Sequence, residues 1–303
     1  MSSHPVRLPR FSVSQVSTLA ASFADDLATY AATGIDGIGI WELKLPAGED
    51  EQSLALVRES GLEVTNCVPQ VPSILPLPLI DGPVDPRERI EAICASIRRL
   101  APFRPQSIVC LTGPAWRLAP EDARRTVVDG LRRVGREAKA NGVHVGLEPM
   151  QRIGGEEWTI VTSIPEAVEL LAEVDEPALG ITFDLWHLWN TETLLDDVAE
   201  HAGRLTGVHV SDWREPTRGW ADRVLPGDGV ANVPAILAAL DAAGWTGPYD
   251  LEVFSDNGAF GSPYPDSLWD VPAAELARRG RDAFLEAWQA ARAVDLASPG
   301  GVV

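Results

Sequence analysis

Short apolar runs alternate with amphipathic stretches along the whole chain. The runs are rich in Val, Ile, Leu and Phe and predict strands at 10–15, 36–41, 63–67, 106–111, 143–148, 180–184, 205–210 and 249–253. Between the strands, apolar residues recur at a spacing near 3.6 and predict helices over 22–33, 50–60, 86–100, 120–141, 163–174, 193–202, 232–243 and 268–293. A regular alternation of strand and helix is typical of a parallel sheet.

Eight strand-helix units in 303 residues predict an α/β fold of the (β/α)₈ TIM-barrel type. The rival fold is a doubly wound open sheet, but no Gly-x-Gly-x-x-Gly follows the first strand. No change of composition marks a linker, so we expect a single domain over 1–303, with flexible tails at 1–9 and 295–303.

The charge balance and the cysteines limit the class of protein. A net charge of −19, from 44 acidic and 25 basic side chains, repels phosphodiesters and argues against nucleic acid as a partner. No apolar run approaches the roughly 18 residues of a membrane span, and the N-terminus lacks the apolar segment of a secretory signal. Cys67, Cys94 and Cys110 show no C-x-x-C spacing and read as core residues in a reducing compartment. We therefore expect a cytoplasmic protein without a membrane partner.

Four apolar runs in the second half of the chain each end in a metal-type ligand. They are VGLEP with Glu148, LGITFD with Asp184, GVHVSD with His209 and YDLEVF with Glu252. Because barrel strands all end at one face, these side chains are expected to meet at the mouth of the barrel. A carboxylate that points into a barrel must be paired, hydrogen-bonded or bound to a metal.

Three carboxylates and one imidazole favour a hard divalent cation. Mn²⁺ suits the set best, with Mg²⁺ or Co²⁺ possible, whereas Zn²⁺ is less favoured because thiolates are absent. Four protein ligands leave two octahedral positions for neighbouring substrate oxygens. A hydroxy-ketone held in this way is activated for loss of its α-proton to an enediolate. Glu148 and Glu252 are the natural pair to remove and return that proton.

His144 is an additional imidazole close to this set. By the two-residue period of a strand it shares the inward face with Gly146 and Glu148. Two interpretations stay open, a further base near the substrate or a core histidine bonded to a neighbouring strand, and the core interpretation is favoured.

These motifs resemble a known family. LEPMQR, FDLWH, GVHVSD, R-x-x-PGDG and LEVF are similar to the sugar phosphate isomerase/epimerase superfamily, the xylose isomerase-like barrels, and the likeness is strongest from 143 to 254. The resemblance implies that Glu148, Asp184, His209 and Glu252 bind the metal and that the two Glu act as acid and base.

The resemblance also implies substrate contacts. His187, three residues after Asp184, and Arg223, three residues before Pro-Gly-Asp-Gly, match the family pattern, although Arg214 or Arg218 remains an alternative to Arg223. Arg152 lies where family epimerases carry a basic residue. Trp41 stands where many relatives place a substrate-binding acid, so here it is expected to contact substrate as an aromatic side chain.

Two long loops follow strands and belong to the same face. Residues 68–86 are either a stiff packed connector or a wall that covers substrate, and 211–231 contain the candidate arginines. The apolar 71–80 stretch is a candidate patch for a homo-oligomer. Six tryptophans, suited to stacking on sugar rings or flat aglycones, fall in or near loops at the mouth: Trp116, Trp158, Trp186, Trp189, Trp213 and Trp220.

The leading hypothesis is a metal-dependent isomerase or epimerase that acts on a small carbohydrate, a ketose or related polyol. The alternative is a lyase of the same superfamily, such as an inosose dehydratase or a lyase of a 3-keto-glycoside, that follows the same proton abstraction with β-elimination. An endonuclease is disfavoured, because five His in all and a charge of −19 do not suit a multi-metal site that binds nucleic acid. A non-enzymatic sugar-binding protein remains open if the site holds no metal.

Overall fold

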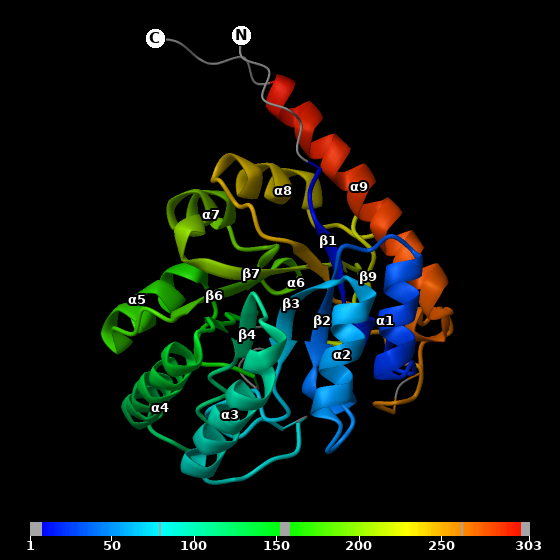
Figure 1. Cartoon of the computed structure of the whole chain (residues 1–303). Coiled ribbons are helices and arrows are strands. Elements are labelled where there is room, and N and C mark those ends of the chain that lie inside the picture. Colours follow the sequence, from blue (N-terminus) through cyan, green and yellow to red (C-terminus); the bar gives the residue numbers. More distant parts are fainter. Residues whose placement is uncertain (1–7, 79, 152–157, 262, 298–303) are drawn as a thin grey trace, which may run out of the picture.

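The eight predicted strands form one closed parallel barrel (Figure 1). The structure is a computed structural model, and it describes residues 8–78, 80–151, 158–261 and 263–297. Each barrel strand pairs with the next along the chain, and the last pairs with the first, which closes the ring. The strands are β1 Phe11–Ser14, β2 Gly37–Trp41, β3 Glu63–Val68, β4 Ser107–Cys110, β5 Val145–Leu147, β6 Leu179–Asp184, β7 Leu205–Val210 and β10 Tyr249–Leu251.

Eight long helices surround the barrel in the described part of the chain. Serine, aspartate or asparagine caps begin several of them, as when the Ser22 hydroxyl accepts a hydrogen bond from the Asp25 amide. Gly61 and Gly142 end two others with positive φ, a conformation that favours glycine. The helices are α1 Phe23–Ala32, α2 Asp50–Ser60, α3 Pro86–Leu100, α4 Pro120–Asn141, α5 Ile164–Val174, α7 Leu194–His201, α8 Val233–Ala242 and α9 Ala273–Ala297.

The last helix completes the outer ring. It packs against α8 and α1, as Figure 1 shows, and Phe284 stacks on Phe11 of β1 with ring centroids 5.0 Å apart. The expected helix over 268–293 is wrong at its start, because a 3₁₀ turn at Leu268–Asp270 is followed by Pro272, and a proline disfavours helical backbone in the residue before it. The helix also continues to Ala297, so 295–297 are helical rather than tail. The other predicted tail residues lie outside the described ranges, except for 8 and 9.

Several short elements were not predicted, among them four 3₁₀ turns at Gln15–Thr18, Glu42–Lys44, Ala101–Phe103 and Ala202–Arg204. A one-turn helix, α6 Leu185–Leu188, follows β6 directly, and β8 Asp212–Trp213 pairs antiparallel with β9 Arg223–Val224 inside the 211–231 loop. Elements of two to four residues carry no hydrophobic period, so the pattern of the sequence does not show them. All three cysteines are buried and free, as expected, and among the described helices none is both long and apolar enough to cross a membrane.

A register shift between β6 and β7 positions the functional face. Ile181 lies opposite Leu205, but Thr182 lies opposite Gly207, so Thr206 is an extra residue in β7. Beyond the shift, Asp184 lies opposite His209. Residues opposite each other in a parallel pair project to the same face, so both side chains enter the barrel.

Glycine at 207 is required by the close approach of strands across the barrel. A Cβ there would overlap the side-chain oxygen of Asn66 on β3. We expect Gly207→Ala to lower the free energy of unfolding by about 1–3 kcal/mol. Gly203→Ala is the matched control, because a Cβ at 203 meets no atom within 4 Å and φ there is not positive. Urea unfolding of both variants checks the prediction, and equal stability of the two would contradict it.

Candidate metal centre

The four predicted ligands come from four strands that are adjacent in the barrel. Glu148 follows β5, Asp184 ends β6, His209 lies in β7 and Glu252 follows β10. Their order around the ring is β5, β6, β7, β10, so one half of the barrel mouth carries the whole set.

The four side chains converge in the interior. One ligand atom from each lies within 4.8 Å of the others, and all four residues are buried, with Glu148 the most exposed at 6%. His209 Nδ1 is 3.5 Å from Glu148 Oε1 and 3.4 Å from Glu252 Oε2. The separations suit ligands grouped around an ion rather than a network of direct hydrogen bonds.

Unpaired polar atoms indicate what the group lacks. Both ring nitrogens of His209 and Oε1 of Glu148 are buried without a hydrogen bond, which is costly unless another partner is bound. Three carboxylates and the adjacent Arg223 together carry a charge of −2 when ionised. A divalent cation with neutral His209 brings the centre to neutrality, so charge and donor set both fit a divalent metal.

Burial and mutual repulsion shift the pKa values of these groups. Burial raises the pKa of Glu148 to about 7, and the charges of Glu252 and Asp184 act in the same direction. Burial would lower the pKa of His209, but the surrounding carboxylates outweigh it and raise the pKa to about 10. Burial would raise the pKa of Asp184, yet Arg223 and the nearby imidazoles hold it below its usual value. In the metal-free protein, protons therefore provide part of the missing positive charge.

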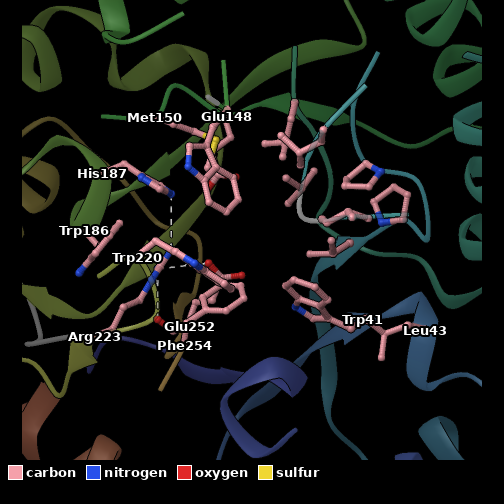
Figure 2. A pocket seen from close by; sticks show the side chains of 18 of the residues that line it. Trp41, Leu43, Glu148, Met150, Trp186, His187, Trp220, Arg223, Glu252 and Phe254 are labelled. Atoms are coloured by element: carbon pink, nitrogen blue, oxygen red, sulfur yellow. Dashed lines mark hydrogen bonds and ion pairs between the residues drawn. The ribbon is translucent and has the colours of Figure 1, made fainter. Parts of the chain in front are cut away.

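Arg223 is the arginine that reaches the centre. Its Nη1 donates to Asp184 Oδ2 at 2.7 Å and lies 3.3 Å from Glu252 Oε2. The guanidinium also lies 4.7 Å from the Trp186 ring and 4.9 Å from the Phe254 ring, which fix its plane. His187 Nε2 is 3.4 Å from Arg223 Nη2, and Figure 2 shows His187, Arg223 and Glu252 side by side at the cavity.

Arg214 and Arg218 belong to a different cluster. Both bind Asp222, which is buried, and Asp266, which is half-exposed, and neither lines the cavity. Of the three arginines in the loop, Arg223 is thus the one beside the ligands. Arg152 lies outside the described residues.

Trp41 and His144 are the remaining predicted substrate contacts, and of the two only Trp41 lies at the cavity. Trp41 lines the cavity, and its Nε1 donates to Ser14 Oγ at 2.9 Å. His144 is exposed and precedes β5, at the end of the strand opposite to Glu148, so both interpretations of it as an inward residue are wrong. The reason is that β5 begins only at Val145, which leaves His144 before the strand, at the N-terminal end of the barrel and exposed to solvent.

A cavity of about 330 Å³ opens above the ligands. Glu148 and Glu252 line it, and so do four tryptophans: Trp41, Trp158, Trp186 and Trp220. Of the other predicted tryptophans, Trp189 and Trp213 pack in a row behind Trp186, and Trp116 is exposed.

The 68–86 loop is packed, as the connector interpretation expects, and its part in covering substrate stays a prediction. Several of its residues, including Leu77, line the cavity, and the loop is braced from behind by Arg89. This buried guanidinium donates to Ser73 O at 2.8 Å and to Pro83 O at 3.1 Å.

Gln151 is a cavity residue that sequence reasoning missed. Its side chain is buried and lines the cavity, yet neither the amide nitrogen nor the amide oxygen has a hydrogen-bond partner. An unpaired amide is costly there, which indicates that a bound molecule completes it. Its position three residues after Glu148 places it near the predicted ligands. A glutamine in a loop is usually exposed to solvent, however, so the sequence alone does not indicate a cavity residue.

A family model of the xylose isomerase-like TIM barrel matches residues 27–288 of the chain. The chain belongs to this family. A curated relative, 3-dehydroshikimate dehydratase of Pseudomonas putida, is 26% identical over 258 residues, which are 79% of this chain and 37% of that protein. The chain spans half or less of the length of the curated relatives it matches.

Two solved structures illustrate the shared fold. L-ribulose 3-epimerase superposes with a TM-score of 0.75 at 19% identity, over 98% of this chain and all of that one. The IOLI protein with a bound zinc atom superposes with a TM-score of 0.73 at 18% identity, over 92% of this chain and 97% of that one. At such identities the likeness shows the fold.

Binding of Mn²⁺ to the metal-free protein is expected to release protons. His209, with its pKa raised to about 10, is protonated at neutral pH, and Glu148 titrates near 7, so both must lose protons to ligate. Affinity for Mn²⁺ should therefore rise with pH from about 7 to about 10. Calorimetric titration at pH 7 in two buffers of different ionisation enthalpy measures the protons released. Identical observed enthalpies in the two buffers would show that no proton leaves.

Replacement of one ligand should weaken the centre selectively. We expect Glu148→Gln to reduce Mn²⁺ affinity by about 10–100-fold or more, because an amide is a neutral and weaker donor. Glu42→Gln is the control, since Glu42 is equally buried at 6% after a strand end but binds Arg99 and the Gln70 amide. If both variants bind Mn²⁺ like the unmodified protein, Glu148 is not a ligand.

Proposed function

We propose that the protein is a divalent-metal-dependent enzyme that isomerises or epimerises a ketose or related polyol. The observation that carries the proposal is the buried set of Glu148, Asp184, His209 and Glu252, of which Glu148 and Glu252 line the cavity. Membership of the family supports it, and so does the fold shared with L-ribulose 3-epimerase.

The donor set favours Mn²⁺, with Mg²⁺ and Co²⁺ as alternatives. Three carboxylates and one imidazole are hard or borderline ligands, although the zinc atom in the IOLI structure shows that a relative by fold accepts zinc. A divalent ion held by these four residues would supply positive charge beside a substrate carbonyl and so favour loss of the proton on the neighbouring carbon.

Glu148 and Glu252 are proposed to move the proton. Both carboxylates line the cavity, and burial raises the pKa of each. A base whose pKa lies near the working pH both takes a proton and returns it effectively. In an epimerisation, one carboxylate removes the proton from carbon and the other delivers a proton to the opposite face.

Arg223 and His187 are proposed to hold a substrate oxygen. Burial lowers the pKa of His187 to about 3, so the ring is neutral and offers one donor and one acceptor. Its Nδ1 has no hydrogen-bond partner, while Arg223 supplies the fixed positive charge beside it. An oxygen that gains negative charge during proton removal is stabilised by such a pair.

A lyase is the second candidate. The relative that matches 79% of this chain is a dehydratase, and inosose dehydratase of Geobacillus thermodenitrificans is 27% identical over 47% of the chain. In that reaction the same carboxylate removes the α-proton, the electron pair of the C–H bond forms a C=C bond, and the β-substituent leaves with its own bonding pair and gains a proton.

Metal dependence tests the proposal directly. Treatment with a chelator should abolish turnover of the substrate, and Mn²⁺ should restore it. Asp184→Asn should resist restoration at Mn²⁺ concentrations that saturate the unmodified protein, because one charged ligand is missing. Full activity of the chelated, metal-free protein would refute the mechanism.

Reaction in D₂O separates the two candidates. Incubation with ketoses and 3-keto-sugars should yield product that carries one deuterium on carbon and otherwise keeps the mass of the substrate. Loss of water or of an aglycone, seen by mass spectrometry, would instead assign the chain to the lyases.

A further inference from the structure

A second cluster of apolar side chains, separate from the barrel core, lies at the mouth. Three partly buried side chains, Trp41, Ile80 and Trp158, pack against its buried members, and every residue of the cluster also lines the cavity. The buried members are Val68, Leu77, Val109, Leu111 and Met150. These side chains therefore present an apolar surface to whatever the cavity holds.

Most of the apolar surface lies on strands other than those of the metal ligands, although Met150 and Trp158 follow β5. β2, β3 and β4 contribute Trp41, Val68 and Val109, whereas β5, β6, β7 and β10 carry the ligands. Figure 2 shows Trp41 and Leu43 on the side of the cavity opposite to His187 and Arg223. The cavity thus has a polar half and an apolar half.

Aromatic rings continue the apolar half across the mouth. Phe254 meets Trp41 and Trp220 edge to face, with centroids 5.7 and 5.6 Å apart. Trp220 in turn meets Phe260 at 4.8 Å. Phe260 lines the cavity although it is 47% exposed, an unusual position for a large apolar side chain unless a ligand covers it.

An unsubstituted sugar fits only part of this cavity. It carries a hydroxyl on nearly every carbon, and a hydroxyl buried against Val109 or Leu77 has no partner. The polar lining residues supplied by the 68–86 loop, Gln70 and Asp81, are exposed to solvent. An apolar group in the same place replaces water and contacts ring faces and branched side chains.

We propose that the substrate is two-ended, with neighbouring oxygens in the polar half and a flat apolar group, such as an aromatic ring, against the apolar half. The oxygen-bearing end rests on the proposed function, while the apolar end rests on the cavity wall alone. Gln151, which lines the cavity with an unpaired amide, is available to a polar atom of this substrate.

Two hydroxamates form a matched pair of probes. Benzohydroxamate and glycolohydroxamate present the same pair of adjacent oxygens, but one carries a phenyl ring and the other a hydroxymethyl group. Calorimetric titration of the Mn²⁺-loaded protein should give roughly tenfold or greater preference for benzohydroxamate, as expected when a ring leaves water for an apolar wall.

Leu77→Ala tests the contribution of the apolar half of the cavity, and Leu45→Ala is its control. Both leucines are 5% exposed and lie in loops after strands, but Leu77 lines the cavity and Leu45 belongs to the barrel core. Leu77→Ala should reduce the preference for benzohydroxamate by roughly three- to tenfold, whereas Leu45→Ala should leave it unchanged. Thermal unfolding confirms that both variants are folded before they are titrated.

The results of these titrations separate the apolar end of the substrate from its oxygen-bearing end. If Mn²⁺ binds and glycolohydroxamate binds as tightly as benzohydroxamate, the apolar end is refuted while the proposed function stands. If Mn²⁺ does not bind, the proposed function fails, and the apolar half of the cavity is then tested with the metal-free protein. In that case 4-nitrophenol should still quench tryptophan fluorescence, more weakly in Leu77→Ala than in Leu45→Ala. Equal quenching in the two variants would overturn the inference.

Discussion

Mutual repulsion among three buried carboxylates is the constraint on which the mouth of the barrel depends. Two like charges about 4 Å apart repel by about 4 kcal/mol even where the effective dielectric constant is near 20. Two cationic side chains reduce this repulsion. Arg223 lies close to the rings of Trp186 and Phe254, and His209 lies close to two of the carboxylates. Arg223 and a protonated His209 leave one negative charge on the three ionised carboxylates, whereas Arg223 and a divalent ion, with His209 neutral, would balance all three. Burial is the main cause of the raised pKa values of Glu148 and Glu252, repulsion between carboxylates adds to it, and the raised values agree with their proposed role in proton transfer.

The barrel supports this arrangement by dividing its strands between two tasks. Strands β5, β6, β7 and β10 contribute charge, and β2, β3 and β4 contribute apolar surface. The family relationship accounts for the first half, because barrels of this kind include isomerases, epimerases and dehydratases that act on small polyhydroxylated molecules. The second half is the part that we propose distinguishes one substrate from another. On this proposal, chemistry and specificity reside on opposite sides of the same ring, with the contacts of Arg89 to Ser73 and Pro83 on the specificity side.

The sequence predicts the charged half far better than the apolar half. Each ligand ends an apolar run, and because parallel strands end at one face, Asp184 and Glu252 can be brought together without knowledge of the structure. Val109 gives no such sign, since strands buried on both faces are apolar throughout and the inward positions look like the outward ones. His144 was misplaced because the start of β5 is decided by pairing with its neighbours, and Gln151 was missed because its burial depends on loops that only the fold brings together.

The extra residue in β7 has a consequence for how such proteins are recognised. Because Thr206 shifts the register, His209 enters the barrel beside Asp184. If the pairing continued from Leu205 without the shift, Val208 would lie opposite Asp184, and the imidazole of His209 would turn toward the surrounding helices. The sequence would still contain every ligand in the right order. Possession of the four motif residues is thus a weaker criterion for a working centre than possession of those residues at the correct count along the strand. A relative without the extra residue is expected to carry its histidine three, rather than four, residues after the counterpart of Leu205.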